Sequence, residues 1–372
     1  MTIQSAARPD LALVHAVLHC NVNTLHLAEA GAFWTALGLR ERMRSHSDDT
    51  DARPLGLVDH TVSDTVFHWD ERGPRAAPAV ELGAWYEPIT QARVVPSDHD
   101  GRVTGFHAVG IRAAEPADLV PEAGLREEVV VQGRRVPALL LTDPDGDPVE
   151  VVQVDLGTVD EPAGGKFSHV RLVSTDLAAT AAWYVCLGFE VVPGPAGTLS
   201  LRLPEDPTFS LEFTEDRTAM RHPWQANTQG LYRIALAVED VHDAHRSLDD
   251  QGLAVPDPVW IPMADAPTGG FTIVVLSDPD ARAAYDRSLA AGPAPVAFIF
   301  ATLPMAMALV GNLRRPTIRW GALAGPAVLV VAGLAVTGVA GMAGGGGVSG
   351  GRAAPGPGLA GVGLPSWGGY GL

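Results

Sequence analysis

The chain has 372 residues, of which 43 are acidic and 26 are basic, and its net charge is −17. Nucleic acid is excluded as an expected partner, because binding to phosphates requires clustered Lys and Arg side chains and Lys166 is the sole lysine. Two cysteines, Cys20 and Cys186, make no disulfide framework. The N-terminus lacks the basic start and long apolar core of a signal peptide, so we expect a cytoplasmic protein.

Two segments of the chain have the same pattern, one beginning at His19 and one at His169. They read HCNVNTLHLAEAGAFWTALGLRE and HVRLVSTDLAATAAWYVCLGFEV. Each has an aromatic pair at the same distance from the histidine, followed by Leu-Gly and an apolar residue. Alternating apolar residues after the histidine predict a strand, and the amphipathic stretch that follows predicts a helix. The recurrence indicates a duplicated architecture.

Two fainter copies of the pattern contain His107 and Arg233. They read GFHAVGIRAAEPADLV and LYRIALAVEDVHDAHRSLDDQGL. The spacing of the four copies leaves room in each for one strand, one helix and three more strands. We therefore expect an α+β protein of four βαβββ modules. We expect these modules to form a first unit at 10–155 and a second at 167–286, with a linker at 156–166.

The repeated pattern resembles the vicinal oxygen chelate superfamily, which includes glyoxalase I, extradiol dioxygenases and bleomycin-resistance proteins. The resemblance covers roughly residues 10–285. In that superfamily two modules wrap around a cup, and metal ligands come from the first and last strands of each module. The resemblance therefore implies one cup in each of the two expected units.

The resemblance also implies a ligand set in the first unit. His19 and His107 match the ligand positions on the first strands. Glu150 follows the turn at 143–146 and matches the glutamate of the last strand, and Glu81 matches it in the first module. The implied set of His19, Glu81, His107 and Glu150 is similar to that of the glyoxalase I branch.

Imidazoles and carboxylates are ligands for Zn, Ni, Mn or Fe(II), so the metal itself stays open. A metal at this place would polarise a substrate oxygen, with Glu81 or Glu150 as the base that moves a proton. Without Glu81, the residues His19, His107 and Glu150 form the two-histidine, one-carboxylate triad of non-haem iron dioxygenases. The two alternatives differ in whether Glu81 binds the metal.

Side-chain alternation along strands predicts the walls of a substrate pocket. Asn21 and Asn23 share the face of His19, and Trp85 shares the face of Glu81. We expect these three side chains to bind polar groups of a substrate or to stack on a ring.

The second unit departs from the pattern. His169 and Glu212 match two ligand positions, but Arg233 stands at the third, and a guanidinium does not bind a metal. The fourth copy reaches the sequence Ser-Asp-Pro-Asp at 277–280, and Tyr285 then falls where the glutamate is expected. We expect a degenerate site here, with His169, Glu212 and Arg233 forming a metal-free pocket in which Arg233 holds an anion.

Residues 287–372 form an apolar tail that contains no Asp or Glu, since all 43 acidic residues precede it. The stretch at 321–343 is long enough to span a bilayer. Four interpretations stay open: a membrane anchor at 321–343, a disordered tail, the product of a shifted reading frame, and a soluble packed tail.

The favoured function is that of a metal-dependent enzyme acting on a small oxygenated substrate by isomerisation, lyase chemistry or oxygenation. The alternative is a metal-free binding protein of the bleomycin-resistance type, which sequesters a drug or metabolite in its cup. The sequence identifies no substrate. It also leaves open whether the cups form within one chain or between the two chains of a homodimer.

Overall fold

The computed structural model describes residues 14–93, 103–119, 125–153, 164–220, 225–253, 255–262, 270–277 and 298–302. The chain divides into two units, residues 1–316 and 317–372, and every described residue belongs to the first. None of the helices in these described ranges combines the length and the apolar character that a membrane crossing needs. The stretch at 321–343 lies outside the described residues.

The described residues form an α+β fold rich in strands, as the sequence predicts. The elements follow one another in four groups. Group 1 contains β1 (Ala16–Asn23), α1 (Leu27–Ala36), β2 (Arg40–Thr50), the 3-10 helix η1 (Arg53–Leu55), β3 (Thr61–Trp69) and β4 (Ala79–Glu87). Group 2 contains β5 (Gly105–Arg112), α2 (Pro116–Leu119), β6 (Leu125–Val131), β7 (Arg134–Thr142) and β8 (Pro148–Val152).

Groups 3 and 4 repeat this order. Group 3 contains β9 (Lys166–Ser174), α3 (Leu177–Cys186), β10 (Glu190–Val192), β11 (Thr198–Arg202) and β12 (Ser210–Glu215). Group 4 contains β13 (Gly230–Ala237), α4 (Val241–Asp250), β14 (Val259–Pro262), β15 (Gly270–Leu276) and β16 (Phe298–Thr302). Asp176 and Asp240 cap the first turns of α3 and α4 by accepting hydrogen bonds from backbone N–H groups.

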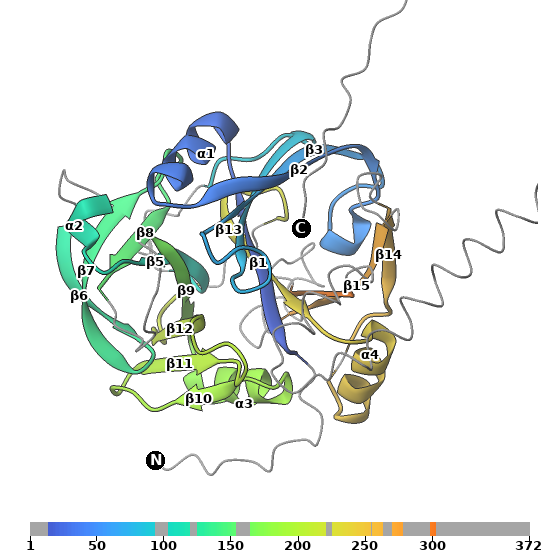
Figure 1. The fold of residues 1–372 in the computed structure, drawn as a ribbon. Coiled ribbons are helices and arrows are strands. Elements are labelled where there is room, and N and C mark those ends of the chain that lie inside the picture. The colour runs from blue at the N-terminus through green and yellow to red at the C-terminus, as the bar shows by residue number, and fades with distance from the viewer. Residues whose placement is uncertain are drawn as a thin grey trace, which may run out of the picture. The chain divides into compact units, whose positions relative to one another are not determined.

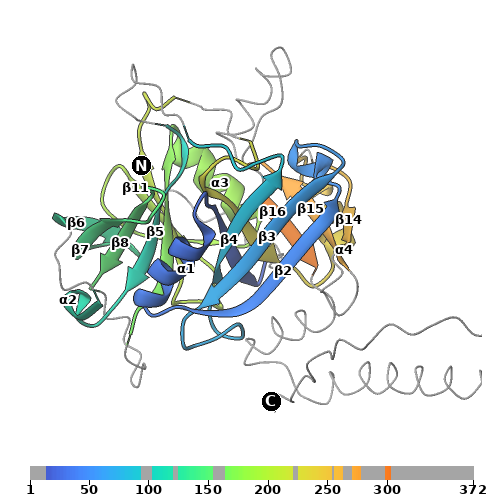
Figure 2. The ribbon, with the colours of Figure 1, turned by 90° about the horizontal axis from the view of Figure 1, so that it is seen from above.

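Hydrogen bonds join the strands into two eight-stranded sheets (Figure 1). Sheet A has the order β14-β15-β16-β13-β1-β4-β3-β2 and unites group 1 with group 4. Sheet B has the order β10-β11-β12-β9-β5-β8-β7-β6 and unites group 2 with group 3. Figure 2 shows β2, β3 and β4 of sheet A side by side.

This pairing differs from the expected units at 10–155 and 167–286. The first strand of group 1, β1, pairs in antiparallel fashion with β13 of group 4, and β5 of group 2 pairs in the same way with β9 of group 3. The strand and helix pattern within a group is the same for either arrangement. The sequence pattern of a group therefore carries no information about which group it pairs with.

The last strand of group 4 lies beyond the boundary that we expected at residue 286. β16 (Phe298–Thr302) runs parallel to β13 and antiparallel to β15, so five residues of the predicted tail belong to sheet A. Its register pairs Ala235 of β13 with Ile299. Tyr285, which we expected at the glutamate position, lies outside the described residues.

Alternation along β4 shows how the sheet faces are divided. Val80 and Leu82 are buried in the main apolar core together with Ala30 and Trp34 of α1. Because neighbouring residues of a strand point to opposite faces, Glu81 lies on the face away from α1. The same core contains residues of sheet B, such as Val109 and Val170, so the helical faces of both sheets share one core.

Candidate functional site

The predicted ligand set is divided between the two sheets. His19 and Glu81 lie in sheet A, on β1 and β4, whereas His107 and Glu150 lie in sheet B, on β5 and β8. The expected pocket of the second unit is divided in the same way, because Arg233 is in sheet A and His169 and Glu212 are in sheet B. Within the described ranges, no three His, Cys, Asp or Glu side chains gather closely enough to hold a metal ion.

Three neighbouring strands of sheet A bring four polar side chains onto one face. Asn21 of β1 pairs with Arg233 of β13 and with Glu81 of β4. Direct partners on neighbouring strands point to the same side of a sheet, as do residues two apart on one strand. His19 therefore joins them. We call the side chains of His19, Asn21, Glu81 and Arg233 face A.

Glu81 is the centre of face A and is 4% exposed. Nη2 of Arg233 donates a hydrogen bond to Oε1 of Glu81 at 2.9 Å, and Nε2 of His19 lies 3.0 Å from Oε2. Burial raises the pKa of Glu81, but the charges of Arg233 and His19 outweigh it and lower the pKa to about 2. Glu81 is therefore ionised near neutral pH.

Four buried polar atoms of face A have no hydrogen-bond partner in the part of the chain that the structure describes. They are Nε and Nη1 of Arg233, Oδ1 of Asn21 and Oε2 of Glu81, the last of which faces His19 as an ion pair. Asn21 is 1% exposed, and the side chain of Arg233 is 11% exposed. A buried donor or acceptor without a partner costs about 1–3 kcal/mol, and a charged one costs more. Face A therefore has hydrogen-bonding capacity for a bound molecule or for water.

An aromatic wall adjoins these polar groups. Phe67 of β3 pairs with Glu81, so it lies on the same side of the sheet. The ring of His19 meets Phe67 edge to face, with centroids 5.2 Å apart, and Phe67 stacks on Trp69 with centroids 5.8 Å apart. Phe67, Trp69 and Ala79 form a buried apolar cluster.

Asn23 and Trp85, which we expected to line a pocket, contact each other. Nε1 of Trp85 donates to Oδ1 of Asn23 at 3.1 Å, and Nδ2 of Asn23 donates to the carbonyls of Ala226 and Thr228 at 2.7 Å each. These bonds use both ends of the Asn23 amide. They give the two residues a part in fixing the segment before β13 against β1 and β4.

The corresponding face of sheet B is built around Glu150, which is 4% exposed. Nε and Nη2 of Arg171 donate to its two oxygens at 2.5 and 2.7 Å, and Nε2 of His169 lies 3.0 Å from Oε2. Although burial raises the pKa of Glu150, hydrogen bonds from Arg171 and His169 lower it to about 2. We call the side chains of Glu150, His169, Arg171 and Glu212 face B.

Glu212 completes face B through contacts with the turn between β6 and β7. Its carboxylate accepts hydrogen bonds from the backbone N–H of Gln132 at 2.7 Å and from the hydroxyls of Ser210 and Ser200 at 2.6 and 2.5 Å. The N–H of Gly133 donates to Ser200 at 2.9 Å. Burial is the main reason that the pKa of Glu212 is raised. The turn between β6 and β7 thus supplies a hydrogen-bond donor to Glu212, whereas Arg171 donates to Glu150.

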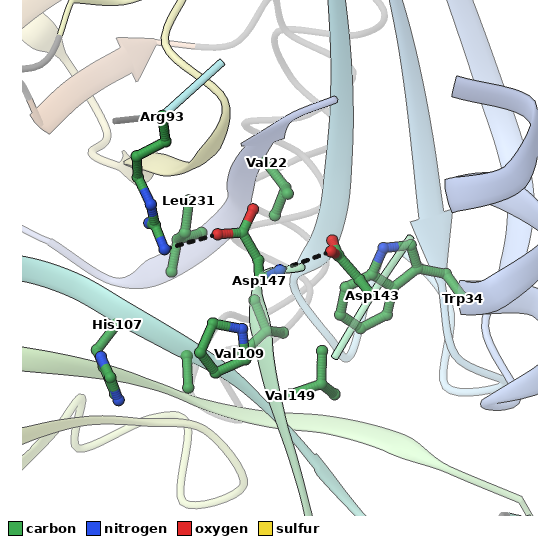
Figure 3. Close-up of a pocket in the computed structure, with 11 residues that line it drawn as sticks. Val22, Trp34, Arg93, His107, Val109, Asp143, Asp147, Val149 and Leu231 are labelled. Carbon is green, nitrogen blue, oxygen red and sulfur yellow. Dashed lines mark hydrogen bonds and ion pairs between the residues drawn. The ribbon is translucent and has the colours of Figure 1, made fainter. Parts of the chain in front are cut away.

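His107 is displaced from face B by a bulge. The register between β5 and β9 shifts between Phe106 and Ala108, so Ala108 pairs with Arg171, and His107 is exposed. His107 also borders a cavity of about 10 Å³ between the sheets, shown in Figure 3. In that view Arg93 pairs with Asp147, at 2.9 Å. The predicted ligand thus lies beside an ion pair between the sheets.

Residues 166–281 match the family model of the Glyoxalase/Bleomycin resistance protein/Dioxygenase superfamily. Residues 166–281 therefore belong to this superfamily. The resemblance stated from the sequence is thereby confirmed. No curated protein sequence matches the chain.

Two solved structures extend the likeness to the fold of a superfamily member. Glyoxalase I from Zea mays is 17% identical over 80% of this chain and 94% of its own, with a TM-score of 0.53. A putative dioxygenase from Bacillus subtilis is 15% identical over 83% of this chain and 92% of its own, also with a TM-score of 0.53. At these identities the likeness shows the fold alone.

Members of this superfamily typically use a divalent metal, and the strand register tests whether face A fits one. The pairs His19–Ala235 and Asn21–Arg233 relate β1 and β13 by an approximate twofold axis. This axis maps His19 onto Arg233. Arginine supplies no metal ligand, so face A lacks one of the ligands that a four-ligand set needs.

Face B does not fit a divalent metal ion either, but for another reason. The pairs His169–Gly110 and Arg171–Ala108 map His169 onto Ala108, and they map Glu212 onto Glu150. Both carboxylates are present, but Arg171 holds both oxygens of Glu150. The sequence interpretation missed Arg171, although it lies two positions after His169 and thus on the same strand face. Neither face offers a divalent ion the donor set that we expected.

Proposed function

We propose that this protein binds a small oxygenated molecule at face A without a metal ion. The observation that carries the proposal is the position of Arg233. The twofold axis relates Arg233 to His19, so its guanidinium replaces the second histidine of a metal site, and it donates a hydrogen bond to Glu81 at 2.9 Å. A permanently charged group beside the carboxylate competes with a divalent cation for it. Its Nε and Nη1 atoms, which have no partner among the described residues, offer hydrogen bonds to ligand oxygens instead. This favours the binding-protein alternative over the metal-dependent enzyme.

The acidity of Glu81 supports the same choice. A general base works best when its pKa lies near the operating pH. Arg233 and His19 keep the pKa of Glu81 at about 2, so this carboxylate is a poor proton acceptor at neutral pH. Face A is therefore better suited to holding a ligand than to abstracting a proton from it.

Metal binding by the full chain tests the proposal. The protein is equilibrated by dialysis with Zn, Ni, Mn or Fe(II), and its metal content is measured beside that of R233H and R233K. We expect no stoichiometric metal in the wild type or in R233K, which keeps the positive charge. We expect a gain in R233H, which removes that charge and adds an imidazole opposite His19.

A metal content of about one equivalent in the wild type, abolished by H19A, would contradict the proposal. It would reinstate the metal-dependent enzyme. Thermal unfolding of each variant, compared with that of the wild type, shows that the differences in metal content are measured on folded protein.

A further inference from the structure

We infer that the ligand of face A is an aromatic hydroxycarboxylate: a small molecule with a carboxylate, a hydroxyl next to it, and an aromatic ring. The inference rests on the proposed function and names its ligand class. Each of the three groups follows from a different feature of face A, and each can be removed from a probe molecule separately.

The carboxylate follows from Arg233. The guanidinium uses Nη2 for Glu81, whereas Nε and Nη1 are buried and have no partner in the described ranges. Hydrogen bonds from a guanidinium to a carboxylate are roughly twice as strong as those between neutral groups. An anionic oxygen therefore satisfies these donors better than a carbonyl oxygen does. Arg233 then lies between two carboxylates, that of Glu81 and that of the ligand.

The hydroxyl follows from Asn21. Oδ1 of its amide is a buried acceptor that lacks a donor among the described residues. Asn21 and Arg233 are direct partners across β1 and β13, which places their Cβ atoms about 5 Å apart. One small molecule can therefore carry both the carboxylate for Arg233 and the donor for Asn21. A hydroxyl on the carbon next to the carboxyl group is a compact arrangement of the two.

The ring follows from the aromatic wall. Phe67 stands beside Glu81 on the neighbouring strand, contacts the ring of His19, and stacks on Trp69. Aromatic pairs prefer edge-to-face or offset geometries and attract one another beyond the burial of their surface. A ligand ring carried past Arg233 and Glu81 meets this wall.

Four probes separate the three groups. 3-Phenyllactate carries all of them, 3-phenyllactamide replaces the carboxylate by a neutral amide, 3-phenylpropionate lacks the hydroxyl, and lactate lacks the ring. Calorimetric titration of the full chain with each probe, in the presence of EDTA, gives the four affinities. We expect 3-phenyllactate to bind most tightly and each other probe to bind about tenfold more weakly or worse.

Variants assign each preference to its residue. R233Q is expected to abolish the preference for 3-phenyllactate over its amide. N21A is expected to abolish the preference for 3-phenyllactate over 3-phenylpropionate while keeping the preference over the amide. R217Q is the matched control, because it also removes a guanidinium. Arg217 lies in the loop between β12 and β13, outside face A, and its side chain is 79% exposed. It is expected to change none of the affinities.

The outcomes distinguish the inference from the proposed function. Equal affinities for the acid and the amide, still dependent on Arg233, overturn the carboxylate and leave metal-free binding intact. A failure of all four probes to bind at millimolar concentration overturns the ligand class, and metal content then tests the function separately. Binding that appears only when EDTA is replaced by a divalent metal overturns both.

Discussion

Face A and face B lie at corresponding places in their sheets, and each places an arginine against a buried glutamate. In face B, Arg171 holds both oxygens of Glu150, and the β6–β7 turn supplies donors to Glu212. In face A, Arg233 contacts one oxygen of Glu81, and two of its nitrogens stay without partners in the described chain. Face B has more residues of metal-ligand type, yet face A has the unused hydrogen-bonding capacity. The unsatisfied polar groups of face A, rather than the number of residues of metal-ligand type, are the reason that we propose it as the binding face.

The largest effect is expected from breaking the ion pair of face B. R171L leaves Glu150 buried with His169 as its remaining partner, and loss of one member of a buried pair costs about 3–5 kcal/mol. R233L in face A is expected to cost less, because it removes one hydrogen bond instead of the three that Arg171 makes. It also removes two nitrogens that have no partner among the described residues. Urea unfolding of the three proteins measures the difference. Equal losses for R171L and R233L would contradict the comparison.

The pair can also be removed as a unit. The double variant E150L/R171L replaces a buried ion pair by apolar groups, and such replacements are often neutral or stabilising. We expect it to recover most of the stability lost in R171L. If the double variant is as unstable as R171L, Glu150 stabilises the fold through contacts other than its pairing with Arg171.

Both faces are expected to destabilise the folded protein in acid. Glu81 and Glu150 have a pKa of about 2 in the folded protein, against an ordinary value of 4.5. The unfolded chain therefore binds more protons between these values, and stability is lost as the pH falls from about 4.5 towards 2. The shift of either group corresponds to about 3 kcal/mol. Urea unfolding between pH 2 and 6 checks this, and E81Q and E150Q should each show a shallower loss than the wild type.

The ion pair of Arg93 with Asp147 is expected to make the stability of the protein depend on pH in the opposite direction. Burial, together with the charges of Asp143 and Asp145, raises the pKa of Asp147 to about 7 despite Arg93. The folded state then binds the proton more tightly than the unfolded chain, so stability falls as the pH rises from about 4 to 7. D147N should flatten this decline. An unchanged slope in D147N would show that another group titrates in this range.

A smaller effect is expected from single polar groups. Ser200 donates to Glu212 and accepts from Gly133, so S200A should cost about 1–2 kcal/mol. N21A should cost less, because Oδ1 of Asn21 makes no hydrogen bond within the described residues. Chemical unfolding measures both changes. A larger loss in N21A than in S200A would mean that Asn21 supports the fold of face A rather than a ligand.

Local sequence patterns predicted the elements that local forces determine. The alternation after His19 and His169 identified β1 and β9, and the second members of the aromatic pairs, Trp34 and Tyr184, are fully buried on α1 and α3. The superfamily followed from the same signals. These predictions depended on periodicities of two and 3.6 residues, which a single segment displays without reference to its partners.

The composition of the site could not be predicted in this way. Whether β1 pairs with β5 or with β13 is decided by contacts between distant segments, and that choice separates His19 and Glu81 from His107 and Glu150. A bulge moves the register of β5 by one residue and replaces His107 by Ala108 beside Arg171. A shift of one residue sends a side chain to the other face of the sheet, although the sequence pattern changes little.

The affinity of the full chain for 3-phenyllactate with and without EDTA tests the central claim most directly. If Arg233 replaces a metal ion at face A, the dissociation constant is the same in both conditions and rises at least about tenfold in R233Q, while R217Q binds like the wild type. Loss of binding in EDTA, with recovery on addition of Zn, Ni, Mn or Fe(II), would contradict the account. It would show that a metal, and not the guanidinium, holds the ligand.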